Sequence, residues 1–177
     1  YKGKEDFAYD YSKATGEKLM IQAFKKGVIQ GCVVRPSSVV GPFDYKPSEM
    51  GKALLDFRAE KIPILPPGGY NFVDVRDVAQ AHFNAGFHEN AKGRYITSAH
   101  STNMIEMAAQ LQEKYGEKYP IPSKAIPKWV LMIMGPLLNK TMNRKMVRNN
   151  IDVSWNADNS KIKNDFGMTF LPLKQTM

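Results

Sequence analysis

Apolar and polar positions recur along the chain with two periods, which predict helices and strands in turn. Residues 10–26 have the period of a helix that packs on a sheet, and Gly27 ends it. The apolar positions of this helix are Ala14, Leu19, Met20, Ala23 and Phe24. Residues 28–34 are rich in β-branched side chains and lie between Gly27 and Pro36, which predicts a short buried strand.

The same two periods continue along the rest of the chain. Residues 1–7 are polar and predict a loop, Asp77 is expected to cap a helix, and Asn103 with Glu106 resembles a capping box. The expected strands are 62–65, 70–75 and 93–99, and the expected helices are 48–60, 78–89, 101–115 and a short one within 158–167. Alternation of strands with helices indicates an α/β fold.

The residue pattern changes in the C-terminal part, where prolines recur around a mostly apolar run at residues 128–134. At most ten residues there are continuously apolar, about half of what a membrane-spanning helix needs. A helix that lies on a membrane surface with basic flanks remains an alternative interpretation of this segment.

Composition narrows the classes of function. The chain has 177 residues, a net charge of +8 and 43% hydrophobic residues, which is typical of one globular domain. Its lysines and arginines are mostly scattered, so we do not expect a nucleic-acid partner. Cys32 is the only cysteine and the three histidines have no metal-site spacing, so we expect neither a disulfide nor a metal site.

Tyr9 and Lys13 are the first candidates for chemistry. Their spacing of four residues places a phenol and an ammonium side by side on one helix face. A nearby cation stabilises a phenolate, which a tyrosine needs in order to act as a base near neutral pH. Many helices carry such a pair as a core tyrosine beside a solvated lysine, and the pair alone favours that reading.

Three blocks of sequence change this preference. They are Tyr9-x-x-Ser12-Lys13-x-x-x-Glu17, then Val33-Val34-Arg35-Pro36-Ser37-Ser38-Val39-Val40-Gly41-Pro42, and then Asn71-Phe72-Val73-Asp74-Val75-Arg76-Asp77-Val78-Ala79. In this order they resemble the extended short-chain dehydrogenase/reductase (NAD-dependent epimerase/dehydratase) superfamily. They look most like its dihydroflavonol-reductase and 3β-hydroxysteroid-dehydrogenase branch.

The resemblance implies a fold and a cofactor. Residues 1–100 would form the C-terminal half of a Rossmann-like doubly wound parallel sheet, and residues 101–177 a small, mostly helical substrate-binding region. The cofactor would be NADP or NAD, held at its pyrophosphate by a glycine-rich turn upstream of Tyr9. The sequence contains no such glycine motif, so we expect a C-terminal fragment that is inactive by itself.

The resemblance also implies roles for single residues. Tyr9 would exchange a proton with the substrate oxygen, and Lys13 would support the phenolate and hold the cofactor ribose. Ser48 could cap a helix or donate to the cofactor phosphate. The turn along the nicotinamide would be Pro36, Ser37, Ser38 and Val39. Residues that would shape the substrate pocket are Phe43, Tyr45 and Trp129.

The expected function is therefore reduction of a ketone or aldehyde, or oxidation of an alcohol, on a small apolar molecule. The alternatives are a nucleotide-sugar epimerase or dehydratase and a non-catalytic NADP-binding or scaffold protein of the same fold. We favour residues 128–138 as a cover over the substrate and do not expect a membrane partner. Homodimerisation through the Tyr9 helix and a default cytoplasmic location complete these expectations.

Overall fold

The computed structural model describes residues 8–59, 61, 64–65, 67–116, 118, 121–138, 144–152 and 156–177. The loop expected at residues 1–7 and part of the strand expected at 62–65 lie outside the described residues. In chain order the elements are α1 (Ala8–Lys25), β1 (Cys32–Pro36), β2 (Ser38–Val40), α2 (Glu49–Arg58), β3 (Gly69–Asp74), α3 (Val75–Phe87), β4 (Gly93–Thr97), β5 (His100–Asn103), α4 (Met104–Tyr115), α5 (Lys128–Leu138), α6 (Arg144–Asn150), α7 (Ser160–Phe166) and α8 (Leu173–Thr176).

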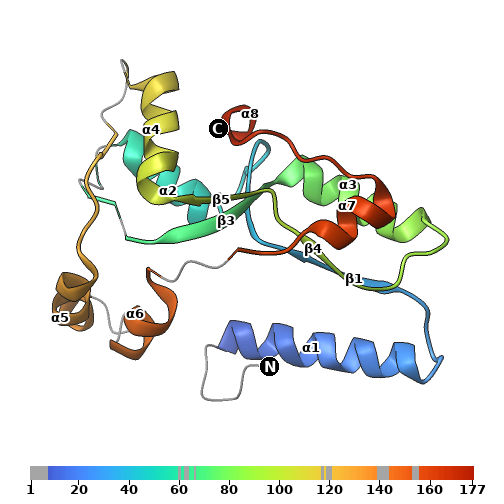
Figure 1. Cartoon of the computed structure of the whole chain (residues 1–177). Coiled ribbons are helices and arrows are strands. Elements are labelled where there is room, and N and C mark those ends of the chain that lie inside the picture. Colours follow the sequence, from blue (N-terminus) through green and yellow to red (C-terminus); the bar gives the residue numbers. More distant parts are fainter. Residues whose placement is uncertain are drawn as a thin grey trace.

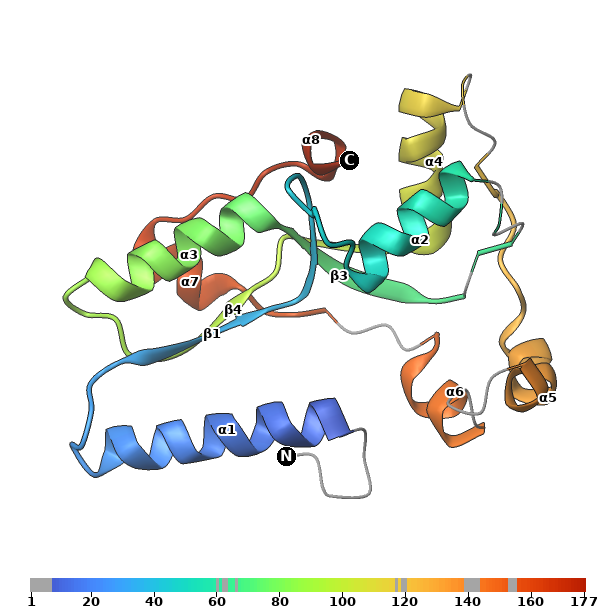
Figure 2. The same ribbon diagram turned by 180° about the vertical axis from the view of Figure 1, so that it is seen from behind.

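A helix–sheet–helix sandwich carries the Tyr9 helix. β1 and β4 pair in parallel, with α1 on one side and α3 and α7 on the other (Figures 1 and 2). The core on the α3 side contains Ala81, Tyr95, Ile162 and Met168. The hydroxyl of Tyr95 donates to Asp165 Oδ2 at 2.9 Å, and Lys161 Nζ lies 3.6 Å from the Tyr95 ring centroid, so α7 is held to β4 by polar as well as apolar contacts.

The second sheet is mixed. β2 pairs with β3 in parallel, and β5 adds to β3 antiparallel. Helices α2, α4 and α8 pack on the face of this sheet that points away from α1, around Phe57, Phe72 and Met107 (Figure 1). The parallel pairs and the helices on both faces confirm the expected Rossmann-like α/β fold. β5 begins at His100, so it crosses the division that the sequence predicted between residues 1–100 and 101–177.

Several predicted elements are confirmed, and their ends differ. Asn103 caps α4, and Glu106 returns the bond in a capping box. The first predicted strand is displaced toward the C-terminus, to Cys32–Pro36, and is half-buried at most. Asp74 caps α3 in place of Asp77, because the helix begins three residues earlier than the hydrophobic pattern indicated. The antiparallel strand β5 was not predicted, since His100–Asn103 contains no apolar residue.

Helix α1 buries little apolar surface against the sheet. None of its side chains is fully buried, and Leu19 and Met20, predicted to pack inward, are exposed. The face turned to the strands instead carries Glu17, whose carboxylate lies 2.5 Å from Arg94 Nε and 3.2 Å from Arg35 Nε. This carboxylate is only 12% exposed, so the two ion pairs hold α1 against both strands.

Replacement of Glu17 by Gln should loosen α1 without unfolding the sandwich. The change removes the charge between Arg35 and Arg94, and charged hydrogen bonds contribute about 1.5–3 kcal/mol each. Amide hydrogen exchange along α1 should therefore be at least tenfold faster. Glu49→Gln is the matched control, because among the described residues Glu49 pairs with Lys52 on an exposed surface. Equal exchange rates in the two variants would contradict this account.

Candidate active site

Tyr9 and Lys13 lie together at the N-terminal end of α1. The Nζ atom of Lys13 is 5.5 Å from the centroid of the Tyr9 ring, which confirms the juxtaposition expected from their spacing. Ser12 Oγ donates to the carbonyl of Tyr9 at 2.8 Å within the same turn. Tyr9 is 70% exposed, so its phenol is open to a ligand instead of packed into a core. Within the described residues Tyr9 is therefore not packed as a core tyrosine.

The turn after β1 lies where ligands bind in open α/β sheets. Pro36 ends β1 and Ser38 begins β2, so Ser37 stands at the carboxyl end of the parallel pair. The backbone N–H of Ser37 donates to the Thr97 carbonyl at 3.0 Å, which fixes the turn to β4. Ser37 Oγ and Thr97 Oγ1 are buried and have no hydrogen-bond partner among the described residues.

These unpartnered hydroxyls bear on the fit of a nicotinamide cofactor. Buried hydroxyls are nearly always hydrogen-bonded, so these two unpartnered ones indicate a polar ligand or water near the end of the β1–β4 pair. The carboxyl end of β1 and the N-terminal end of α1 lie toward the same side of the molecule (Figures 1 and 2). The residues present thus fit a polar cofactor that reaches from the Ser37 turn to Lys13.

Ser48 acts as a helix cap. Its hydroxyl accepts from Gly51 N at 3.1 Å and donates to Asp44 Oδ2 at 2.9 Å, while both Asp44 oxygens accept from Ser48 N. The first of the two readings of Ser48 is confirmed. An Asp44 carboxylate at the start of α2 already occupies the place that a phosphate prefers. Sequence analysis missed Asp44, although an acidic residue four positions before a capping serine was the available signal.

Two cavities border this region. A cavity of about 200 Å³ brings together Val39, Phe43 and Ser48 from the predicted site. A larger one, of about 670 Å³, lies between α2, α4 and α8 and has an apolar lining with Arg58, Arg76 and Lys114 among its cationic residues. Tyr9, Lys13, Tyr45 and Trp129 line neither cavity. The predicted residues therefore form three groups, one on α1, one between β1 and the start of α2, and Trp129 on α5.

Phe43 has an unusual backbone. Its φ of 71° lies in the left-handed region, which costs a bulky residue about 1–3 kcal/mol. The rings of Phe43 and Tyr45 are 6.3 Å apart, and both side chains are largely exposed. Strain of this kind persists where surrounding contacts fix the chain, here the bonds between Asp44 and Ser48. The loop thus holds two aromatic rings out from the protein in a fixed arrangement.

Asp74 and Asp77, at the start of α3, have a structural role. Asp74 is buried and accepts from Arg76 N, Nε and Nη2, and these hydrogen bonds lower the pKa of Asp74. Burial raises the pKa of Asp77, whose Oδ2 accepts from Leu171 N at 3.0 Å. Arg76 also donates to the Gln175 carbonyl at 3.3 Å. These residues therefore hold Leu171 and Gln175 against the start of α3.

The comparison with family models decides where the chain belongs. The model described as "NAD dependent epimerase/dehydratase family" matches residues 3–97, which is more than half of the chain. The chain belongs to this family. The match covers α1 with Tyr9 and Lys13, the Ser37 turn and strands β1 to β4, so the family features and the site coincide.

The curated relatives of the chain carry the names of reductases and related enzymes. It is 26% identical over 171 residues to "Sterol demethylase protein B" of Methylococcus capsulatus, covering 90% of this chain and 51% of that protein. It is 32% identical over 127 residues to a "Putative dihydroflavonol 4-reductase" of Synechocystis, covering 70% of this chain and 36% of that protein. The chain thus spans about half of the first relative and about a third of the second.

Solved structures agree on the fold. The crystal structure of gox2253 superposes with a TM-score of 0.79 at 21% identity, covering 95% of this chain and 53% of that one. Other proteins of this fold were crystallised with NAD or NADPH. Among the described residues no helix is long and apolar enough to cross a bilayer, and no three metal-ligating side chains cluster.

Asp74→Asn and Asp77→Asn should change stability with opposite dependence on pH. The pKa of Asp74 is lowered by folding, so its contribution is present above the ordinary aspartate pKa of about 3.9 and is lost as pH falls below it. Asp74→Asn should cost about 1–3 kcal/mol at neutral pH and progressively less in acid. Chemical denaturation of the variant and the wild-type protein, from neutral pH to below the ordinary aspartate pKa, measures this difference in stability.

For Asp77 the dependence of stability on pH has the opposite sign. Its pKa is raised by folding, so the wild-type protein loses stability as pH rises from the ordinary aspartate pKa through the raised one. Asn can still accept the bond from Leu171 N without a buried charge. Asp77→Asn should therefore gain stability relative to wild type over that window. If the stability of the two variants relative to wild type changed with pH in the same direction, both assigned pKa directions would be contradicted.

Proposed function

We propose that this chain is the catalytic part of an NAD(P)-dependent oxidoreductase. The reaction is reduction of a ketone or aldehyde, or oxidation of an alcohol, on a small apolar molecule. The observation that carries the proposal is the exposed Tyr9 phenol with Lys13 Nζ 5.5 Å from its ring, at the helix end that lies toward the Ser37 turn. Relatives described as dihydroflavonol reductases support the choice of reductase.

In this proposal Tyr9 moves the proton. Its hydroxyl donates to the carbonyl oxygen of the substrate during reduction and takes the proton back during oxidation. Lys13 keeps a positive charge beside the phenol, which favours the phenolate formed when the proton leaves, and its ammonium hydrogen-bonds the ribose hydroxyls. The bound nicotinamide supplies or accepts the hydride.

The turn at Pro36, Ser37, Ser38 and Val39 positions that ring. Ser37 is held to Thr97 through its backbone, so its buried hydroxyl stays available for the cofactor. Phe43 and Tyr45 present two exposed rings beside the turn, and an apolar substrate gains contact area from them. A phosphate at Ser48 would have to displace Asp44, so we assign Ser48 a capping role. Trp129 stays a predicted pocket residue.

The whole protein tests the assignment of Tyr9. Tyr9→Phe should lower kcat by about 10²–10⁴-fold, because the proton donor is lost, while cofactor affinity changes little. Tyr11→Phe is the matched control and should keep normal turnover, since Tyr11 is half-buried two residues further along α1. Turnover is followed by oxidation of NADPH or NADH, and cofactor affinity by fluorescence titration. Near-normal kcat in Tyr9→Phe would contradict the role.

A substrate panel separates the proposed reductase from its alternatives. A nucleotide-sugar epimerase or dehydratase would use the same Tyr9 and Lys13 but act on sugar nucleotides without net consumption of cofactor. We expect turnover with apolar ketones and aldehydes and none with sugar nucleotides. Cofactor binding without turnover of either class would instead favour a non-catalytic NADP-binding or scaffold protein.

A further inference from the structure

Nearly all the net charge of the chain lies in one stretch. Residues 118–151 contain seven of the 25 Lys and Arg residues and none of the 17 Asp and Glu residues, so they carry +7 of the net charge of +8. The cations are Lys118, Lys124, Lys128, Lys140, Arg144, Lys145 and Arg148, of which Lys140 lies outside the described residues. The other 143 residues are close to neutral.

The cations around α5 and α6 lie in a stretch, residues 118–151, that contains no acidic residue. Several cations elsewhere pair with carboxylates, as in Lys52–Glu49, Lys161–Asp165 and Lys174–Glu113. In the part of the chain that the structure describes, Lys124, Arg144, Lys145 and Arg148 are exposed and form no ion pair with a carboxylate. These charges are therefore open to an anion from outside the described chain.

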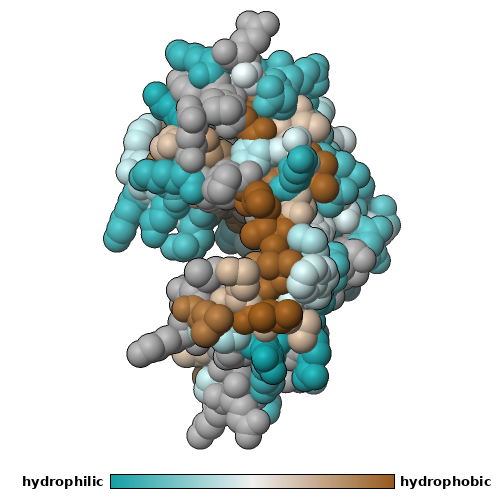
Figure 3. Space-filling view, turned by 90° about the vertical axis from the view of Figure 1, so that its left-hand side faces the viewer, coloured by the Kyte–Doolittle hydropathy of each residue, from teal (hydrophilic) through white to brown (hydrophobic). Residues whose placement is uncertain are grey.

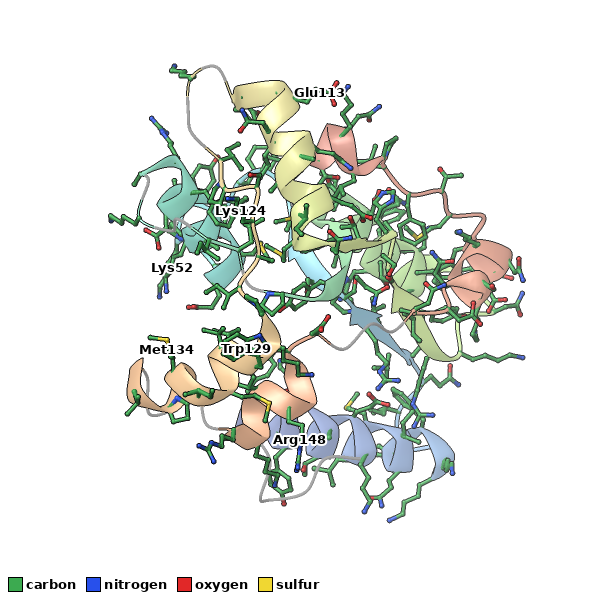
Figure 4. All side chains as sticks on the ribbon, turned by 60° about the vertical axis from the view of Figure 1, so that its left-hand side comes forward. Lys52, Glu113, Lys124, Trp129, Met134 and Arg148 are labelled. Carbon is green, nitrogen blue, oxygen red and sulfur yellow. The ribbon has the colours of Figure 1, made fainter. Side chains whose placement is uncertain are left out.

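The same region exposes an apolar helix face. Trp129, Ile133, Met134 and Leu137 follow one another at i, i+4, i+5 and i+8 on α5, and they are 66%, 57%, 46% and 84% exposed. Figure 4 shows Trp129 and Met134 projecting from the same helix, and Figure 3 shows apolar side chains gathered on this side of the molecule. The opposite side of α5 is used internally, because Leu131 packs with Val147 and Ile151.

We propose that α5 and α6 form a docking surface for an anionic lipid bilayer. The exposed face of α5 would enter the headgroup region with Trp129 at the interface, and the surrounding cations would contact lipid phosphates and carboxylates. A cover over a small apolar substrate needs the apolar face but no surplus of cations. A nucleic acid would neutralise the cations and leave the apolar face in water. A bilayer satisfies both features at once.

This proposal revises the preference drawn from the sequence, which favoured the cover. The sequence showed the basic flanks and the apolar run but not that the run is exposed along one whole face. The helix is too short to span a bilayer, so the docking is peripheral and reversible. It is independent of the proposed chemistry at Tyr9, and it replaces the pocket role predicted for Trp129.

Vesicle binding tests the proposal with Trp129 as reporter. In a Trp155→Phe background, Trp129 is the only tryptophan, because the chain contains two. Phosphatidylcholine vesicles that contain phosphatidylserine should bind the protein in flotation and shift the Trp129 emission to the blue. Vesicles of phosphatidylcholine alone should bind at least tenfold more weakly, and added salt should weaken binding to the anionic vesicles.

Matched variants locate the surface. Lys145→Gln with Arg148→Gln should lower the partition coefficient roughly 25-fold, at about fivefold for each charge, whereas Lys25→Gln with Lys26→Gln should leave it nearly unchanged. Ile133→Gln with Leu137→Gln should lower it at least tenfold. Phe83→Gln with Phe87→Gln removes two exposed apolar side chains of α3 and should have little effect. Circular dichroism checks that each variant is folded.

Three results would overturn the proposal. One is absence of binding to anionic vesicles, and another is binding that the α5 and α6 variants do not reduce. The third is a blue shift of Trp129 emission produced equally by soluble polyglutamate, which would identify a general polyanion surface instead of a lipid one. A blue shift produced by an apolar ketone without vesicles, together with no vesicle binding, would restore the reading of α5 as a substrate cover.

Discussion

The position of the Tyr9 phenol depends on the carboxylate of Glu17. α1 buries no side chain completely, so packing alone does not determine how the helix is rotated on the sheet. Glu17 lies between Arg35 of β1 and Arg94 of β4, and a nearly buried charge is tolerated only with such partners. Because Tyr9, Lys13 and Glu17 follow at four-residue intervals on α1, the two ion pairs set the rotation of the helix. A polar contact in the middle of the sandwich thereby sets the direction in which Tyr9 and Lys13 point.

Sequence reasoning succeeded where residue type alone decides the contact. The spacing of Tyr9 and Lys13 and the capping box at Asn103 depend on neighbours within one turn, and the structure contains both. Ser48 illustrates the limit of such local reasoning. Its sequence position allowed a cap or a phosphate donor, and only the geometry of Asp44 distinguishes them.

The failures came from interactions between distant segments. Leu19 and Met20 were expected to pack inward because apolar residues usually do, but Glu17 turns its own face of α1 toward the strands instead. β5 could not be predicted from His100–Asn103, since a polar strand forms there only because β3 offers a free edge. The start of α3 was misplaced because Asp74 and Asp77 are equally good caps in sequence, and the bond from Leu171 N selects the role of Asp77.

Residues 156–177 make hydrogen bonds to several elements that come much earlier in the chain, among them β3, α3 and β4. Asn71 accepts from Ala157, Asp77 from Leu171, and Asp165 from Tyr95, over separations of 70 to 94 residues. Closing loops of that length costs conformational entropy before any contact is gained. On a ribosome, β4 and α3 are therefore made long before Ile162 and Met168 can complete their core. The sandwich that holds the Tyr9 helix thus acquires its final packing only when this segment has been synthesised.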